Sequence, residues 1–177
     1  MSLNSHELRK TKIIHAKKHK DNLKRNPIVL VLDEVLDTYN IGSFFRLADA
    51  IGAQKLYLCG PVVTPPNIKI HRASIGTWKF VPWEHFENTL DCLSKLKKEG
   101  YFVVACEQNK TSISYKSAKY KFPIALVLGS EVNGISKETL KVVDQIVEIP
   151  MFGINKSLNV LVAASVISYN ILTDLST

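Results

Sequence analysis

Short apolar runs recur along the chain, each bounded by polar or turn-forming residues. Their length and their content of β-branched side chains predict strands. The runs cover residues 28–32, 55–59, 101–106, 124–129 and 145–150. Four of the five show no alternation of apolar and polar residues, which is typical of strands covered on both faces. This feature constrains the fold most, because such a sheet needs helices on both of its faces.

Helical patterns separate these runs. The apolar spacing predicts helices over residues 40–51, 84–99, 136–142 and 157–172. Ser136 and Ser157 are candidate N-caps, and Gly100 is a candidate stop signal. Strands that alternate with helices predict an α/β fold with a mainly parallel sheet flanked by helices. In such sheets ligands bind beyond the carboxyl ends of the strands, so we look for chemistry in the loops there.

Positive charge is concentrated at the N-terminus. Residues 1–25 hold eight basic and two acidic side chains, so this segment carries +6 of a net charge of +7. A chain of 177 residues fits one domain, and we expect a basic arm over 1–25 and one domain over 26–177. A thin apolar stripe favours a helix over 4–24. The asymmetry indicates a polyanionic partner, and the alternative is a solvated segment that aids solubility.

Several function classes lack their signatures. The chain contains no GxGxxG, P-loop or HExxH pattern, and Cys59, Cys92 and Cys106 form no CxxC pair. We expect these cysteines to be small core residues in a reducing compartment. No apolar run approaches the ~18–20 residues of a transmembrane helix, and the N-terminus lacks the apolar core of a secretory signal. We therefore expect no metal, no membrane span and a cytoplasmic location.

Three segments that follow predicted strands combine glycine with polar side chains. In residues 37–53, Asn40 and Gly42 open a helix that carries Arg46. The structural alternatives for Arg46 are a side chain that snorkels to solvent or an ion pair with Asp49.

The second segment, residues 124–136, ends a strand in Gly129, where a ligand can approach the backbone, and Glu131 follows as either a solvated or a functional acid. In residues 146–172 a glycine-containing loop joins a strand to a long apolar helix, and Met151 is either core filler or part of a site.

Together these segments resemble the three motifs of the SpoU/TrmH family of RNA ribose 2′-O-methyltransferases, within the SPOUT superfamily. The order and spacing of the motifs match, and the resemblance covers roughly residues 27–172. The matching positions are Asn40, Gly42, Arg46 and Ala48, then Gly129, Glu131 and Gly134, then Ile149, Pro150, Met151, Gly153, Ser157, Leu158, Asn159 and Val160.

The resemblance implies S-adenosylmethionine (AdoMet) as methyl donor, RNA as substrate, a homodimer and a deep trefoil knot within about 124–172. The implied catalytic residues are Arg46, Asn40, Glu131, Ser157 and Asn159. The implied AdoMet-binding residues are Glu107, Gln108, Leu128, Gly129, Gly134, Ile149, Met151, Ser157 and Leu158. The candidate RNA-binding residues are Arg9, Lys10, Lys12, Lys17, Lys18, Lys20, Lys24, Arg25, Arg46 and Arg72. Because arginine stays protonated in proteins, we expect Arg46 to stabilise the developing alkoxide rather than to act as a base.

Two other functions remain open. A non-catalytic RNA-binding protein would keep the fold, although the intact motif residues argue against it. A SPOUT base methyltransferase would use the same cofactor, although the N-x-G-x-x-x-R and S-L-N patterns favour ribose chemistry. The sequence does not select the RNA, and we expect tRNA rather than rRNA because short family members often act on tRNA.

Overall fold

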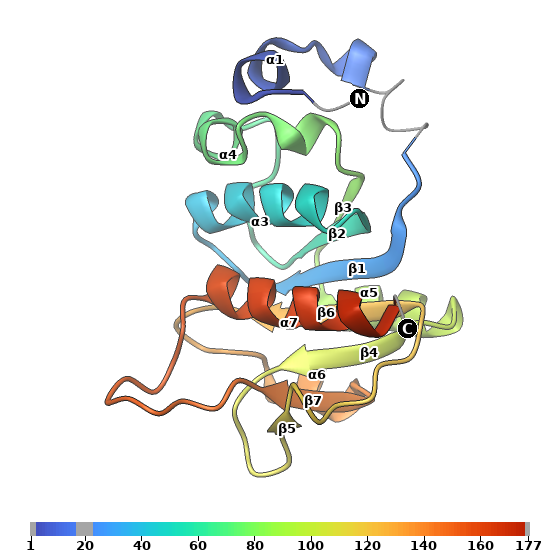
Figure 1. Cartoon of the computed structure of the whole chain (residues 1–177), viewed down its shortest axis with the longest axis vertical. Coiled ribbons are helices and arrows are strands. Elements are labelled where there is room, and N and C mark those ends of the chain that lie inside the picture. The colour runs from blue at the N-terminus through green and yellow to red at the C-terminus, as the bar shows by residue number, and fades with distance from the viewer. Residues whose placement is uncertain (1–2, 17–22, 176–177) are drawn as a thin grey trace.

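A seven-stranded sheet runs through the centre of the molecule, in the order β3-β2-β1-β6-β4-β7-β5 (Figure 1). The computed structural model describes residues 3–16 and 23–175. The strands are β1 (Asn26–Asp33), β2 (Ala53–Cys59), β3 (Trp83–Phe86), β4 (Phe102–Cys106), β5 (Ile113–Ser114), β6 (Ile124–Gly129) and β7 (Gln145–Glu148). Every pair of neighbouring strands runs parallel. The predicted parallel sheet is confirmed, and each of the predicted runs contributes a strand.

Helices cover both faces of the sheet. They are α1 (Ser5–Lys10), α3 (Thr38–Ala50), α4 (Ile68–Ser74), α5 (Thr89–Lys98), α6 (Lys137–Val142) and α7 (Val160–Leu175), with a 3-10 helix, η1 (Thr77–Lys79). α3 and α7 pack on one face and α5 and α6 on the other, while α4 packs against α3 (Figure 1). The α/β fold flanked by helices is therefore confirmed.

Alternate side chains of β1 divide the core into two clusters. Ile28, Leu30 and Leu32 pack with side chains of α3 and α7, whereas Val29 and Val31 pack with side chains of α5 and α6. Fully burying a side chain of this size stabilises the fold by about 1.5–3 kcal/mol. Both faces of the strand are thus covered, which explains why its sequence does not alternate.

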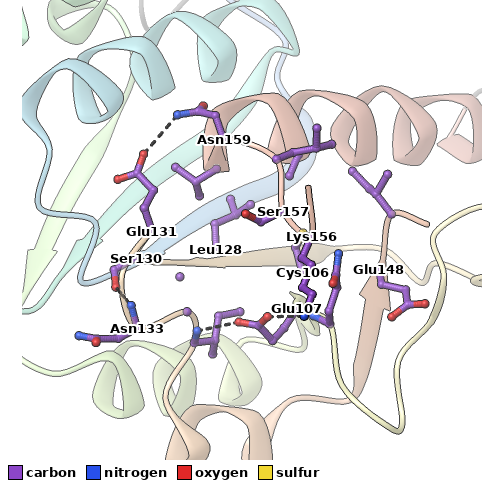
Figure 2. A pocket seen from close by; sticks show the side chains of 18 of the residues that line it. Cys106, Glu107, Leu128, Ser130, Glu131, Asn133, Glu148, Lys156, Ser157 and Asn159 are labelled. Atoms are coloured by element: carbon purple, nitrogen blue, oxygen red, sulfur yellow. Dashed lines mark hydrogen bonds between the residues drawn. The ribbon is translucent and has the colours of Figure 1, made fainter. Parts of the chain in front are cut away.

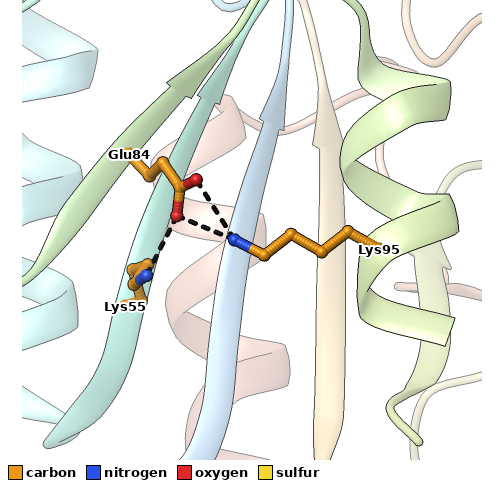
Figure 3. A network of polar contacts seen from close by, with 3 residues as sticks. All are labelled: Lys55, Glu84 and Lys95. Atoms are coloured by element: carbon orange, nitrogen blue, oxygen red, sulfur yellow. Dashed lines mark hydrogen bonds and ion pairs between the residues drawn. The ribbon is translucent and has the colours of Figure 1, made fainter. Parts of the chain in front are cut away.

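The predicted helix over 84–99 is wrong over residues 84–88, of which 84–86 belong to edge strand β3. Asn88 is extended, with φ −134°, and its side chain accepts a hydrogen bond from the backbone N–H of Leu90, so α5 begins only after it. Glu84 of β3 accepts hydrogen bonds from Lys55 of β2 at 3.0 Å and from Lys95 of α5 at 3.0 and 3.1 Å (Figure 3). This network joins three elements that are separate in the sequence.

The prediction of one helix over 4–24 is also wrong. α1 opens with a capping box between Asn4 and Glu7, and it ends at Lys10 because Thr11 is extended, with ψ 126°. A further helical turn covers 13–16, and residues 17–22 lie outside the described part of the chain. α1 lies over α4, at the end of the molecule nearest β3 (Figure 1).

Two expectations concern membranes and cysteines. Among the helices of residues 3–16 and 23–175, none has the length and apolarity to cross a membrane. All three cysteines are free thiols. Cys59 and Cys92 are buried, which confirms them as core residues, whereas Cys106 is only partly buried and lies at a pocket.

Candidate active site

A pocket of about 660 Å³ opens beyond the carboxyl ends of β4, β6 and β7 (Figure 2). Three stretches of chain line it, each beginning at the end of one of these strands. They contribute Cys106, Glu107, Gln108 and Asn109, then Leu128 to Ile135 and Leu140, and then Glu148, Ile149, Met151, Asn155 to Val160 and Ala163. The parallel order of the sheet therefore gathers segments that are far apart in the sequence.

Gly129 allows the loop after β6 to fold back tightly onto the strand. A Cβ atom at Gly129 would lie 2.3 Å from the carbonyl carbon of Gly134 and 2.4 Å from the nitrogen of Ile135. The loop closes with the Gly134 N–H donating to the Ser130 carbonyl at 2.9 Å, and Gly134 has φ +65°. The close approach requires glycine at 129, and the left-handed conformation favours it at 134.

Glu107 ties the loop after β4 to the loop after β6. Its Oε2 accepts from the Ile135 backbone N–H at 3.0 Å, and its Oε1 accepts from the Gln108 N–H at 2.9 Å (Figure 2).

Burial, followed by the charge of Glu107, raises the pKa of Cys106 to about 12. The Cys106 thiol therefore stays protonated at neutral pH, which excludes it as a thiolate nucleophile.

One residue from each of the three sequence motifs meets at the rim of the pocket. Asn40 of α3 donates its side-chain N–H to Glu131 Oε1, and Asn159 Nδ2 donates to the same oxygen at 3.2 Å. Asn159 Nδ2 also lies 3.4 Å from Asn40 Oδ1. Figure 2 shows the link between Glu131 and Asn159. This cluster fastens α3 to the loop after β6 and to the start of α7.

Asn159 also caps the N-terminus of α7, which begins at Val160. Its Oδ1 accepts from the backbone N–H groups of Leu161 at 2.9 Å and Val162 at 3.4 Å. The predicted start of this helix at Ser157 is therefore wrong, because Ser157 lies in the loop and donates its own N–H to Asn155 Oδ1 at 3.4 Å. The predicted cap at Ser136 is confirmed by its bond from the Thr139 N–H at 3.1 Å.

Arg46 lies outside the pocket in the described chain. It is exposed on α3, and its position six residues after Asn40 turns it to another side of the helix. Arg25, rather than Arg46, is the cation whose charge acts on Asp49: burial raises the pKa of Asp49, and Arg25 lowers it in part. The same Arg25 donates to the carbonyls of Ala53 and Phe80 at 2.9 Å each, so its guanidinium has a structural role.

All nine predicted AdoMet-binding residues line the pocket. So do three predicted catalytic residues, Glu131, Ser157 and Asn159. Sequence reasoning missed Cys106, Glu148 and Lys156, of which the first two stand at strand ends and could have been found from that position. Lys17, Lys18 and Lys20 lie outside the described residues. In the described ranges, no group of three or more His, Cys, Asp or Glu side chains is arranged to hold a metal ion.

The chain is similar in sequence to known RNA methyltransferases. The sequence profile of the SpoU rRNA Methylase family matches residues 27–169. The 23S rRNA (guanosine-2'-O-)-methyltransferase RlmB of Ralstonia nicotianae is 34% identical over 146 residues, which are 82% of this chain and 58% of that protein. The tRNA (guanosine(18)-2'-O)-methyltransferase of Aquifex aeolicus is 31% identical over 147 residues, covering 82% of this chain and 69% of that protein.

A solved structure agrees with these matches. The AdoMet-bound rRNA methyltransferase from Sinorhizobium meliloti superimposes with a TM-score of 0.80 at 27% identity, over 89% of this chain and 60% of that one. The chain thus spans between 58% and 69% of the length of these three proteins.

Proposed function

Since the chain belongs to the SpoU rRNA Methylase family, we propose that it transfers a methyl group from AdoMet to a ribose 2′-hydroxyl of RNA. The observation that carries the proposal is the meeting of Asn40, Glu131 and Asn159, one from each motif, beside the pocket. Relatives with this activity act on 23S rRNA and on tRNA.

The chemistry of the pocket fits AdoMet. Leu128, Ile149 and Leu158 offer apolar surface for an adenine ring, and Gly129 leaves the strand end without a side chain. Glu131 and Glu148 place carboxylates at a pocket that would hold a sulfonium cation. AdoMet supplies the electrophilic methyl group when it is bound. The protein has to hold it, exclude water and stabilise the oxygen that attacks.

We assign that stabilising role to Arg46. The ribose hydroxyl loses its proton during attack, and a guanidinium near the oxygen stabilises the charge that develops. Arg46 does not line the pocket of its own chain. An active site that contains both the AdoMet pocket and Arg46 therefore needs the arginine of another copy of the chain.

A homodimer would satisfy this need, because a second copy can present its α3 to the pocket. Apolar side chains stand exposed around the pocket mouth in support of such an interface, with Val132 90% and Phe152 96% exposed. Leu158 lines the pocket and is 40% exposed. Contiguous apolar patches on a protein surface often mark interfaces with a partner.

The C-terminal part of the chain is proposed to form the deep trefoil knot within about residues 124–172. The topology supports this, because β6 lies between β1 and β4 and α7 returns to pack against α3. In Figure 1 the loop between β7 and α7 projects far from the body before the chain turns back. The knot would hold the loops of the pocket together without a disulfide.

We further propose tRNA, rather than rRNA, as the substrate, a cytoplasmic location, and a division into a basic arm (1–25) and a methyltransferase domain (26–177). The positive arm supports an RNA partner, and the similar protein of Aquifex aeolicus is a tRNA methyltransferase.

The proposal is tested by incubating the protein with AdoMet and tRNA or rRNA from a strain that lacks the gene. Mass analysis of the nucleosides is expected to show one new 2′-O-methylated nucleotide. A methyl group that stays on the released base would indicate a base methyltransferase. RNA binding with no response to AdoMet in calorimetry would indicate a non-catalytic binding protein.

A further inference from the structure

Lys79 of η1 fastens the N-terminal helix α1 to the rest of the molecule. Its ammonium group donates to the carbonyl of Arg9 at 2.9 Å and to the carbonyl of Thr11 at 2.8 Å, with the Leu8 carbonyl at 3.5 Å. These carbonyls belong to the last turn of α1 and the residue after it, where intrahelical donors run out. A cation at this end also interacts favourably with the helix dipole. Lys79 therefore completes α1 from a different part of the chain.

The backbone at Gly76 is shaped for the same contact. A Cβ atom there would lie 2.6 Å from the Leu8 carbonyl oxygen and 3.2 Å from the Cα of Arg9. Gly76 has φ +88°, and the preceding Ile75 has φ +55°, a conformation that a β-branched residue rarely adopts. The turn between α4 and η1 thus brings its backbone directly against α1, independently of the Lys79 side chain.

Docked in this way, α1 lies among positive charges that face solvent. Arg9, Lys10 and Lys12 are exposed, and so are Lys69 and Arg72 on α4, over which α1 lies (Figure 1). Burial, then the charges of Lys79 and Arg9, lowers the pKa of His71 on α4. Arg9 of α1 therefore lies close enough to α4 for its charge to act on His71.

We infer that Lys79 is a positioning residue that holds residues 4–12 as a preformed part of the RNA-binding surface, continuous with Lys69 and Arg72 of α4. This inference rests on the proposed function, because it names the surface on which the RNA substrate lies. Lys79 directs its N–H groups to carbonyls, so the phosphates are contacted by the cations that it positions. Preformed surfaces bind more tightly because ordering entropy is not lost on association.

The experiment compares the full chain with Lys79→Met, which keeps the aliphatic stem and removes the donors. Lys98→Met is the matched control, because Lys98 is an exposed lysine of α5, on the other face of the sheet. Amide hydrogen exchange without RNA is expected to speed up about tenfold or more at Leu8 and Thr11 in Lys79→Met, since a hydrogen bond from a charged group contributes about that factor. Lys98→Met is expected to leave it unchanged.

Binding of an unmodified tRNA pool is measured from low to high salt. Lys79→Met is expected to weaken affinity about tenfold at every salt concentration, with little change in the slope of log K against log salt. A full-length variant with Arg9, Lys10 and Lys12 changed to Gln is expected to reduce that slope by about 2–3. In this neutral background, Lys79→Met is expected to have little further effect on affinity.

Each of the following results would overturn the inference. Unchanged exchange at Leu8 and Thr11 in Lys79→Met would show that Lys79 does not hold α1. A reduced salt slope in that variant, or a full additional loss in the neutral background, would make Lys79 a direct phosphate contact. Normal tRNA binding by every variant of an enzyme that still methylates RNA would refute the inference alone. A wild-type protein that neither binds nor methylates tRNA and rRNA would refute the proposed function as well.

Discussion

Replacing Gly129 with alanine tests how closely the pocket depends on one missing side chain. The new Cβ would lie 2.3, 2.4 and 2.5 Å from backbone atoms of Gly134 and Ile135. Ordinary contact begins at 3.4 Å, so the loop after β6 has to retreat by about 1 Å. Backbone atoms cannot rotate away as a flexible side chain would. We expect overpacking to lower the free energy of unfolding by about 1–3 kcal/mol.

The displaced loop carries the contacts that shape the pocket. Ile135 would move from Glu107, and Glu131 would move from Asn40 and Asn159. AdoMet affinity should therefore fall together with stability. In the free variant the loop can open and remove the overpacking. If the loop has to close again when AdoMet binds, binding costs the full overpacking energy, and the dissociation constant rises by about 5-fold to 150-fold.

Urea unfolding gives the change in stability, and titration calorimetry with AdoMet gives the change in affinity. Gly153→Ala is the stability control, because a Cβ there meets nothing within 4 Å. The control should stay within about 1 kcal/mol of the wild type, since alanine at a compatible glycine position changes stability only slightly. A Gly129→Ala protein with wild-type stability and affinity would refute the reasoning, because it would mean that the loop yields without cost.

Other perturbations probe the site and the fold. Arg46→Ala should lower methyl transfer by about 10²–10³-fold and leave AdoMet binding intact, and near-normal transfer to tRNA would remove Arg46 from the mechanism. Hydrogen bonds from Lys55 and Lys95 outweigh burial and lower the pKa of Glu84 from its usual value of 4.5. Glu84→Gln should therefore lower the free energy of unfolding by about 1 kcal/mol or less at pH 7, because the ion pairs are partly exposed. The difference in stability from wild type, measured by urea unfolding, should vanish as the pH falls through the lowered pKa of Glu84. A constant difference across that range would contradict an ionic origin of the stabilisation. With its pKa near 12, Cys106 should react with iodoacetamide at pH 8 at least about 10³-fold more slowly than an unfolded thiol, and rapid labelling found by peptide mass analysis would exclude the protonated state.

Most of the sheet and the pocket could be predicted because they rest on local patterns. The strand 124–129 is buried on both faces, so its sequence is apolar throughout, and its final glycine marks the approach of the next loop. Strand β3 was missed because all four of its residues are only partly buried. An edge strand of this kind lacks the continuous apolar run that identifies the central strands.

The remaining errors come from contacts between distant segments. Serine and asparagine are both good N-caps, so the sequence could not choose between Ser157 and Asn159. The choice follows from Glu131, which holds Asn159 in place by a hydrogen bond at 3.2 Å. The role of Lys79 had no local signal either, because backbone carbonyls accept its hydrogen bonds and every residue has one.

The side chain of Asn159 has only one acceptable orientation. Its oxygen faces the N–H groups of α7, and its nitrogen faces the carboxylate of Glu131. Aspartate has almost the same shape and is an equally good N-cap, yet it would set two negative oxygens against each other at this position. Position 159 therefore favours asparagine over aspartate, because only the amide nitrogen can donate to Glu131. Spontaneous deamidation there would damage the site while the helix and the core remained intact.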